Sequence, residues 1–172
     1  MISYYKNKFI DTNIPINENL LHGIGIFETI KFIDNGILFF DEHLDRLFSN
    51  SFFNFSKLKK NEIYNNAKKL ISKNSLNKGV IKIVVVPLEN DWNQLEYYIL
   101  IRELPKISSD KVKVIFYSED EYPILRFNPL YKSLFYMGNI AAQKKAKLSG
   151  AFEPIFFNNN KLITEGAMRN IF

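Results

Sequence analysis

The segment that most constrains the fold is a long run of β-branched and aromatic residues, Ile24–Ile33. Such a composition is typical of a β-strand. An Asp-Asn-Gly turn follows at 34–36, and an Asn-Gly pair between two apolar runs is the strongest short signal for a β-hairpin. We therefore expect this strand to turn back into a second strand at 37–40.

Two segments with helical spacing follow the hairpin. Asp41 is the expected N-cap of the first helix, because its carboxylate can accept a hydrogen bond from the free backbone N–H groups of the first turn. The second helix is expected at 61–73. The apolar residues at helical spacing are Leu44, Leu47, Phe48 and Phe55 in the first segment and Ile63, Ala67, Leu70 and Ile71 in the second.

The rest of the chain holds short elements separated by turn residues. A polar loop at 88–94 joins two strands, and the segment 105–110, which contains Pro, Ser and Asp, carries the strongest linker signal. This linker predicts two domains, 1–107 and 108–172. The expected elements are strands at 2–5, 8–10, 80–86, 96–102 and 111–116, a helix at 138–148 closed by Gly150, and a hairpin that joins 154–157 to 162–164.

Composition excludes several classes of site. The chain has no cysteine, which excludes a disulfide framework, a thiolate metal site and a cysteine nucleophile. Only His22 and His43 can supply imidazole, so a multi-histidine metal centre is also excluded. The net charge is +5, but the lysines are spread along the chain rather than gathered into the stripe of a nucleic-acid-binding protein. We therefore predict neither a metal nor a nucleic acid as partner.

The sequence shows neither a secretory signal peptide nor a membrane-spanning segment. The first residues lack the apolar core of a secretory signal peptide, and no apolar run approaches membrane-spanning length. We therefore expect a cytoplasmic protein that does not interact with membranes.

Three segments carry residues that can perform chemistry. The first reads GIGIFETIK at 23–31 and is followed by FFDEHLDRL at 39–47; the second reads YKSLFYMGN at 131–139; the third reads ITEGAMRNIF at 163–172. Taken singly, each has an ordinary explanation, since lysines are usually solvated and aromatic side chains usually pack in a core.

Together and in this order, the three segments resemble the class IV, or fold type IV, pyridoxal-phosphate enzymes. The resemblance rests most on K-S-L-x-Y around Lys132 and on E-G-x-x-x-N-[IL]-F, which begins at Glu165. This family includes branched-chain aminotransferases, D-amino-acid aminotransferases and 4-amino-4-deoxychorismate lyase. It implies an α+β fold with a small N-terminal α/β domain and the beginning of a larger mixed β domain, and it implies a homodimer.

The resemblance also implies roles for residues at the matching positions. Lys132 would hold pyridoxal 5'-phosphate as a Schiff base and would then move the α-proton of the amino substrate. Glu165 would keep the pyridine nitrogen protonated. Arg46 would bind the phosphate through its planar guanidinium. Tyr136 would reach towards the phenolic oxygen of the cofactor, and Asn170 would lie near the phosphate.

Simpler explanations compete with these roles. Arg46 could be an exposed helix residue paired with Glu42 one turn earlier. Tyr136 could be a core aromatic. Arg169 stands where many relatives carry a hydroxyl side chain, and it could direct its charge towards the phosphate or the substrate.

The reaction follows from comparing the branches of the family. Branched-chain aminotransferases carry F-E-G-x-R where this chain has Phe-Glu-Thr at 27–29, and D-amino-acid aminotransferases carry an R-x-x-H carboxylate trap where the loop at 88–94 has neither Arg nor His. In the lyase branch, the hydroxyl of Thr29 would lie near the cofactor and assist proton movement. We therefore expect a lyase of folate biosynthesis that converts 4-amino-4-deoxychorismate to 4-aminobenzoate and pyruvate.

Alternatives to this reaction remain open. One is a class IV aminotransferase of the branched-chain or D-amino-acid type, and another is an inactive or divergent member of the family. A basic binding module without catalysis is the non-enzyme alternative, and it predicts salt-sensitive association with nucleic acid. Members of the family continue beyond the position of Phe172 with a second phosphate-binding loop, so we expect the sequence to be the N-terminal part of a longer protein.

Overall fold

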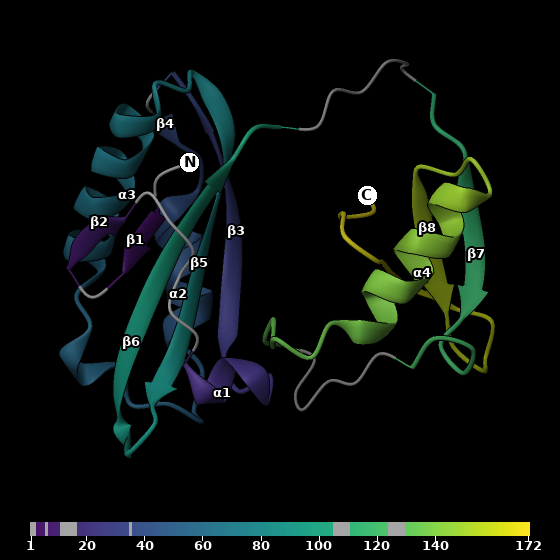
Figure 1. Cartoon of the computed structure of the whole chain (residues 1–172). Helices are drawn as coiled ribbons and strands as arrows, with labels where there is room; N and C mark the ends of the chain where they lie inside the picture. Colours follow the sequence, from purple (N-terminus) through teal and green to yellow (C-terminus); the bar gives the residue numbers. More distant parts are fainter. Residues whose placement is uncertain (1–2, 6, 11–16, 35, 105–110, 124–129) are drawn as a thin grey trace. The chain divides into compact units, whose positions relative to one another are not determined.

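The computed structural model describes residues 3–5, 7–10, 17–34, 36–104, 111–123 and 130–172, and the chain divides into two compact units (Figure 1). The first unit contains the described residues up to 104 together with 130–134. The second contains 111–123 and 135–172. The linker predicted at 105–110 lies outside the described residues, so the domain boundary near residue 107 stays a prediction.

The first unit is an antiparallel sheet covered on one face by two helices (Figure 1). Its strand order is β2-β1-β6-β5-β3-β4. The strands are β1 (Ser3–Tyr5), β2 (Lys8–Ile10), β3 (Ile26–Ile33), β4 (Gly36–Ile37), β5 (Lys78–Leu88) and β6 (Asp91–Arg102). The helices are α1 (Glu18–Leu21), α2 (Phe40–Phe48) and α3 (Lys60–Asn74), with a 3-10 turn η1 (Phe55–Lys57).

The core of this unit lies between the sheet and helices α2 and α3. Ile30 and Phe32 of β3 are fully buried, whereas Lys31 between them is exposed, as the period of two of a strand requires. Burial of each such apolar side chain contributes about 1.5–3 kcal/mol. The predicted apolar face of the second helix is confirmed, since Ile63, Ala67, Leu70 and Ile71 are all fully buried.

The start of α2 differs from the prediction. The strand expected at 37–40 ends at the short β4, Phe39 takes a left-handed conformation with φ 52°, and Phe40 is already helical and buried. Asp41 is therefore not the N-cap. It lies in the first turn, where its negative charge interacts favourably with the helix dipole. Of the apolar residues that suggested a strand, Ile37 lies in β4 and Phe40 begins the helix, where its buried side chain joins the core.

Three other predicted bounds also shift. The first helix ends at Phe48, and Phe55 lies in η1, where its ring stacks on Phe48 at 4.7 Å between centroids. The polar loop at 88–94 is mostly strand, because β5 and β6 pair up to Leu88 and Asp91 and only two residues connect them. Pairing with β5 thus outweighs the polar composition. The strand expected at 111–116 begins three residues later.

The second unit is a small sheet with one helix. Strands β7 (Val114–Ser118), β8 (Glu153–Phe157) and β9 (Ile163–Gly166) lie in that order, and α4 (Met137–Leu148) connects the parallel pair β7 and β8. A parallel pair needs such a crossover. The helix packs its buried alanines, Ala142 and Ala146, against the sheet. The predicted closure by Gly150 is confirmed, because its φ is +68°.

No helix in the described ranges is both long enough and apolar enough to cross a membrane.

Candidate active site

Backbone hydrogen bonds hold Lys132 beside the start of β3. The carbonyl of Lys132 accepts a hydrogen bond from the Phe27 amide at 2.8 Å, and the Leu134 amide donates to the Gly25 carbonyl at 3.0 Å. These bonds hold Lys132 in the first unit, beside the Phe-Glu-Thr segment at 27–29. The residue is half-buried.

Gly25 allows this close approach. A Cβ at this position would lie 2.8 Å from each of three atoms: Cδ1 of Leu134, the Val85 carbonyl oxygen and Cγ1 of Val86. Its φ of +154° also disfavours an L side chain. Glycine is therefore needed for the Lys132 segment to pack against β3.

We expect Gly25→Ala to lower the free energy of unfolding by about 1–3 kcal/mol more than Gly150→Ala, because it adds steric overlap to backbone strain. Gly150 is a matched control: its φ is also positive, but a Cβ there would have no neighbour within 4 Å. Urea unfolding of both variants measures the difference. Equal losses would show that strain alone, not crowding by the Lys132 segment, acts at Gly25.

Thr29 lies on the face of β3 away from the helices. Phe27, two residues earlier, shares that face, and Thr29 pairs with Lys82 of β5. The Nζ of Lys82 lies 3.9 Å from the centroid of the Phe27 ring. Burial, followed by the charge of Arg102, lowers the pKa of Lys82. The surroundings of Thr29 are thus partly desolvated and positively charged.

Arg46 binds Glu28 rather than Glu42. Its Nε lies 2.6 Å from Oε1 of Glu28, and its Nη2 lies 2.6 Å from Oε2. Nδ1 of His43, on the same helix, lies 2.8 Å from Oε2. Burial opposes ionisation of Glu28, but hydrogen bonds from His43 and Arg46 outweigh it and hold the pKa of the carboxyl below its usual value. The alternative explanation, an Arg46 paired with Glu42, is therefore wrong.

The guanidinium of Arg46 still has donors to offer. Of its five N–H groups, one on Nε and one on Nη2 donate to Glu28, and among the described residues nothing else accepts from the two on Nη1 or the second on Nη2. The Arg46 side chain is 45% exposed, whereas that of Glu28 is 2% exposed. The remaining edge of the fork suits a phosphate or carboxylate.

In the second unit, Asn139 holds Glu165. Nδ2 of Asn139, in the first turn of α4, donates to Oε1 of Glu165 and to the Ala167 carbonyl, both at 3.2 Å. Asn139 is 1% exposed. Sequence reasoning missed this residue, although its position seven residues after Lys132 and its poor helix propensity were available signals.

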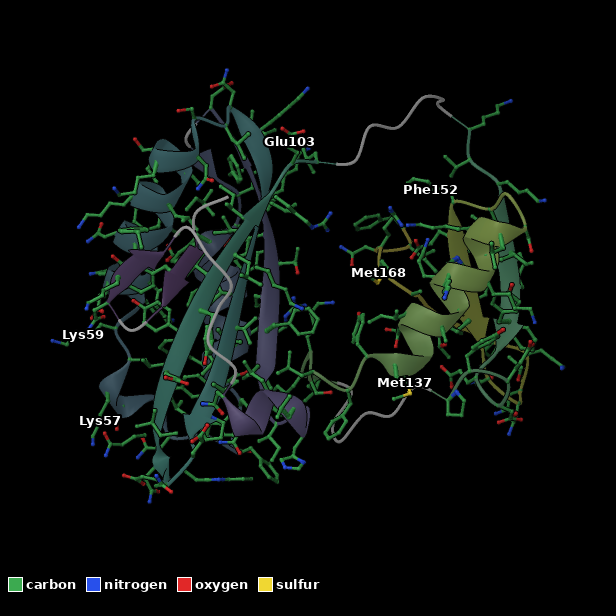
Figure 2. All side chains as sticks on the ribbon, viewed as in Figure 1. Lys57, Lys59, Glu103, Met137, Phe152 and Met168 are labelled. Atoms are coloured by element: carbon green, nitrogen blue, oxygen red, sulfur yellow. The ribbon has the colours of Figure 1, made fainter. Side chains whose placement is uncertain are left out.

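Arg169 has a structural partner within its own unit. Its guanidinium donates to Oε2 of Glu153 and lies 3.9 Å from the centroid of the Phe152 ring. Oε1 of Glu153 accepts the backbone amides of Met168 and Arg169 at 2.6 and 3.0 Å. Figure 2 labels two residues of the second unit named here, Phe152 and Met168. The charge of Arg169 therefore stabilises the turn after β9, and a role towards phosphate or substrate stays a hypothesis.

The expected site residues fall into both units. Lys132, Thr29 and Arg46 belong to the first, while Tyr136, Glu165 and Asn170 belong to the second. Tyr136 directly precedes α4 and is half-buried, and Asn170 is exposed. Asn139, Glu28, His43 and Glu153 are the additions that the structure makes to this set.

The chain is similar to known proteins over most of its length. Residues 25–172 match the family model described as Amino-transferase class IV. A protein of Methanocaldococcus jannaschii assigned as a branched-chain-amino-acid aminotransferase is 27% identical, and the match covers 98% of this chain and 64% of that protein.

Solved structures share the fold. A hypothetical aminotransferase from Mycobacterium tuberculosis, in its PLP-bound form, has a TM-score of 0.74 at 17% identity, over 97% of this chain and 65% of that one. A protein from Legionella pneumophila assigned as a 4-amino-4-deoxychorismate lyase has a TM-score of 0.71 at 23% identity, over 92% of this chain and 61% of that one. The chain thus spans less than two thirds of each of these three relatives.

Proposed function

The chain belongs to the family Amino-transferase class IV, and from that premise we propose that the protein is the lyase that converts 4-amino-4-deoxychorismate to 4-aminobenzoate and pyruvate. The match confirms the resemblance found in the motifs, and the cofactor of the family is pyridoxal 5'-phosphate. The observation that carries the choice of reaction is the connection between β5 and β6, where only Glu89 and Asn90 intervene and neither is Arg or His. A carboxylate trap of the D-amino-acid aminotransferase type has no residues there, and Thr29 stands where the branched-chain motif F-E-G-x-R has its glycine.

The residues present fit the cofactor. Arg46 offers an exposed guanidinium edge for the phosphate, and Lys132 offers a half-buried primary amine. Glu165 offers a carboxylate whose Oε1 is fixed by Asn139. A cation, an amine and a carboxylate are the groups that pyridoxal phosphate requires of a protein.

In the proposed mechanism each side chain has a defined role, and Lys132 both holds the cofactor and moves a proton. When bound, pyridoxal phosphate supplies an electron-withdrawing ring that stabilises negative charge on the carbon next to the substrate nitrogen. The amine of Lys132 removes the proton from that carbon. Glu165 keeps the pyridine nitrogen protonated, and Arg46 holds the phosphate. Thr29 assists proton movement while pyruvate departs and the substrate ring becomes aromatic.

An aminotransferase is the second candidate, favoured by the Methanocaldococcus jannaschii relative. Incubation with 4-amino-4-deoxychorismate separates the two reactions. The lyase releases 4-aminobenzoate and pyruvate in equal amounts with no added 2-oxo acid. Consumption of a branched-chain or D-amino acid only when a 2-oxo acid is present would instead identify an aminotransferase. Failure to bind the cofactor, with salt-sensitive binding of nucleic acid, would support the non-enzyme alternative.

We expect Arg46→Lys to weaken pyridoxal phosphate binding by about tenfold, or ~1.4 kcal/mol, because lysine keeps the charge but loses the planar fork. Fluorescence titration of both proteins with the cofactor measures the change. Unphosphorylated pyridoxal is the control ligand, and its affinity should stay the same. An equal dissociation constant for pyridoxal phosphate would make Arg46 a structural partner of Glu28 alone.

The remaining assignments complete the proposal. We place the protein in the cytoplasm as a homodimer with two domains, 1–107 and 108–172, and we assign Tyr136 and Asn170 to the cofactor site. Support comes from their positions in the family motifs, since Tyr136 follows Lys132 by four residues and Asn170 closes the E-G-x-x-x-N segment. Sedimentation analysis of the protein tests the homodimer.

A further inference from the structure

Glu28 is a charged residue in a position built for an apolar one. The other inward positions of β3 are Ile26, Ile30 and Phe32, which form the core of the first unit. Glu28 has the same inward orientation, and its side chain is 2% exposed. Burial of a carboxylate is strongly unfavourable unless it is paired and hydrogen-bonded. The proposed reaction uses Glu28 nowhere, so the residue has another role.

Two side chains of α2 compensate the buried charge. His43 and Arg46 are three residues apart and so share one face of the helix. Together they place three nitrogen atoms within 2.6–2.8 Å of the two carboxylate oxygens. The result is a bidentate ion pair, supported by an imidazole, that links β3 to α2. Such a pair fixes the plane of the guanidinium as well as its position.

The fixed plane decides where the free donors of Arg46 point. Glu28 takes the edge formed by Nε and Nη2, so the edge formed by Nη1 and Nη2 is directed away from the carboxylate. A free arginine side chain samples many rotamers, and an anion must remove that freedom when it binds. Glu28 has already restricted that freedom. An anion that reaches Arg46 therefore meets a preorganised pair of donors.

We propose that Glu28 is a positioning residue which, with His43, orients Arg46 so that its free edge receives the phosphate of the cofactor. This inference rests on the proposed function, because it takes pyridoxal phosphate as the ligand. The inference and simple electrostatics predict opposite changes in pyridoxal phosphate affinity when Glu28 loses its charge. Removal of a negative charge beside an anion site should strengthen anion binding by Coulomb's law, whereas loss of positioning should weaken it.

The test compares two ligands in five proteins: wild type, Glu28→Gln, Arg46→Lys, the double variant of these two, and Glu42→Gln. We expect Glu28→Gln to weaken pyridoxal phosphate binding by about tenfold and to leave pyridoxal binding unchanged, because only the phosphate depends on Arg46. Glu42 is the matched control, an exposed carboxylate on α2, and Glu42→Gln should change neither affinity. In an Arg46→Lys background, Glu28→Gln should add little further loss.

Results that contradict the role of Glu28 can be distinguished from results that contradict the proposed reaction. Unchanged or tighter binding of pyridoxal phosphate by Glu28→Gln would overturn the inference, and an equal loss for both ligands would reduce Glu28 to a structural residue. Should Glu28→Gln fail to fold, Glu28→Asp keeps the charge on a shorter side chain, and its loss should again be confined to the phosphorylated ligand. Because affinity is measured without turnover, absence of lyase products with the expected affinities would contradict the proposed reaction alone.

Discussion

Lys132→Ala is expected to abolish the visible absorbance of the lysine-bound cofactor and to lower turnover at least about 10³-fold, since one side chain performs both covalent attachment and proton transfer. Alanine provides no amine. Cofactor affinity should fall without vanishing, because Arg46 still offers its guanidinium edge to the phosphate. Absorbance spectra and product assays at saturating cofactor measure both effects.

The structure indicates that Lys132→Ala leaves the fold intact. The segment is held to β3 through the carbonyl of Lys132 and the amide of Leu134, and alanine retains the backbone groups. The free energy of unfolding should therefore stay within about 0.5 kcal/mol of wild type. Lys147→Ala, which removes an exposed lysine from α4, is the control and should behave as wild type. A Lys132→Ala protein with undiminished turnover would contradict the assignment.

The sequence predicts elements well where periodicity is strong. The second helix was found with its buried face because four apolar residues recur at helical spacing. The start of α2 was predicted too late in the sequence. The left-handed Phe39 and the buried Phe40 reflect tertiary packing that overrides local preference. The β5–β6 turn was missed for a similar reason: cross-strand pairing carries β6 down to Asp91 despite its polar sequence.

In the candidate site, too, some residues could be predicted from local motifs and others only from tertiary contacts. Lys132 and Glu165 could be selected from their motifs, because the chemistry of a pyridoxal cofactor needs an amine and a carboxylate. Glu28 and Asn139 are defined by contacts with residues distant in the sequence, Arg46 and Glu165 respectively. The sequence nevertheless contained a signal for each residue. Glu28 is a charged residue at an inward position of the strand, and Asn139 is a poor helix former near the start of a helix.

Glu165→Gln is expected to lower turnover by about 10²–10³-fold while the cofactor still binds, because a neutral amide cannot keep the pyridine nitrogen protonated. Glutamine keeps an oxygen that can accept the hydrogen bond from Nδ2 of Asn139, and the bond from Asn139 to the Ala167 carbonyl is untouched. The substitution therefore removes the charge and spares the packing. Rates at saturating cofactor measure the loss.

Glu121→Gln is the matched control for this change. Glu121 belongs to the same unit, and its carboxylate is exposed and pairs with Lys145 at 3.0 Å. An exposed pair of this kind contributes about 0–1 kcal/mol to stability, so its loss should leave turnover unchanged. A Glu165→Gln rate within about twofold of wild type would make Glu165 a structural partner of Asn139. A large loss confined to Glu165→Gln would instead assign the effect to the negative charge of Glu165, since the variant can keep the hydrogen bond from Asn139.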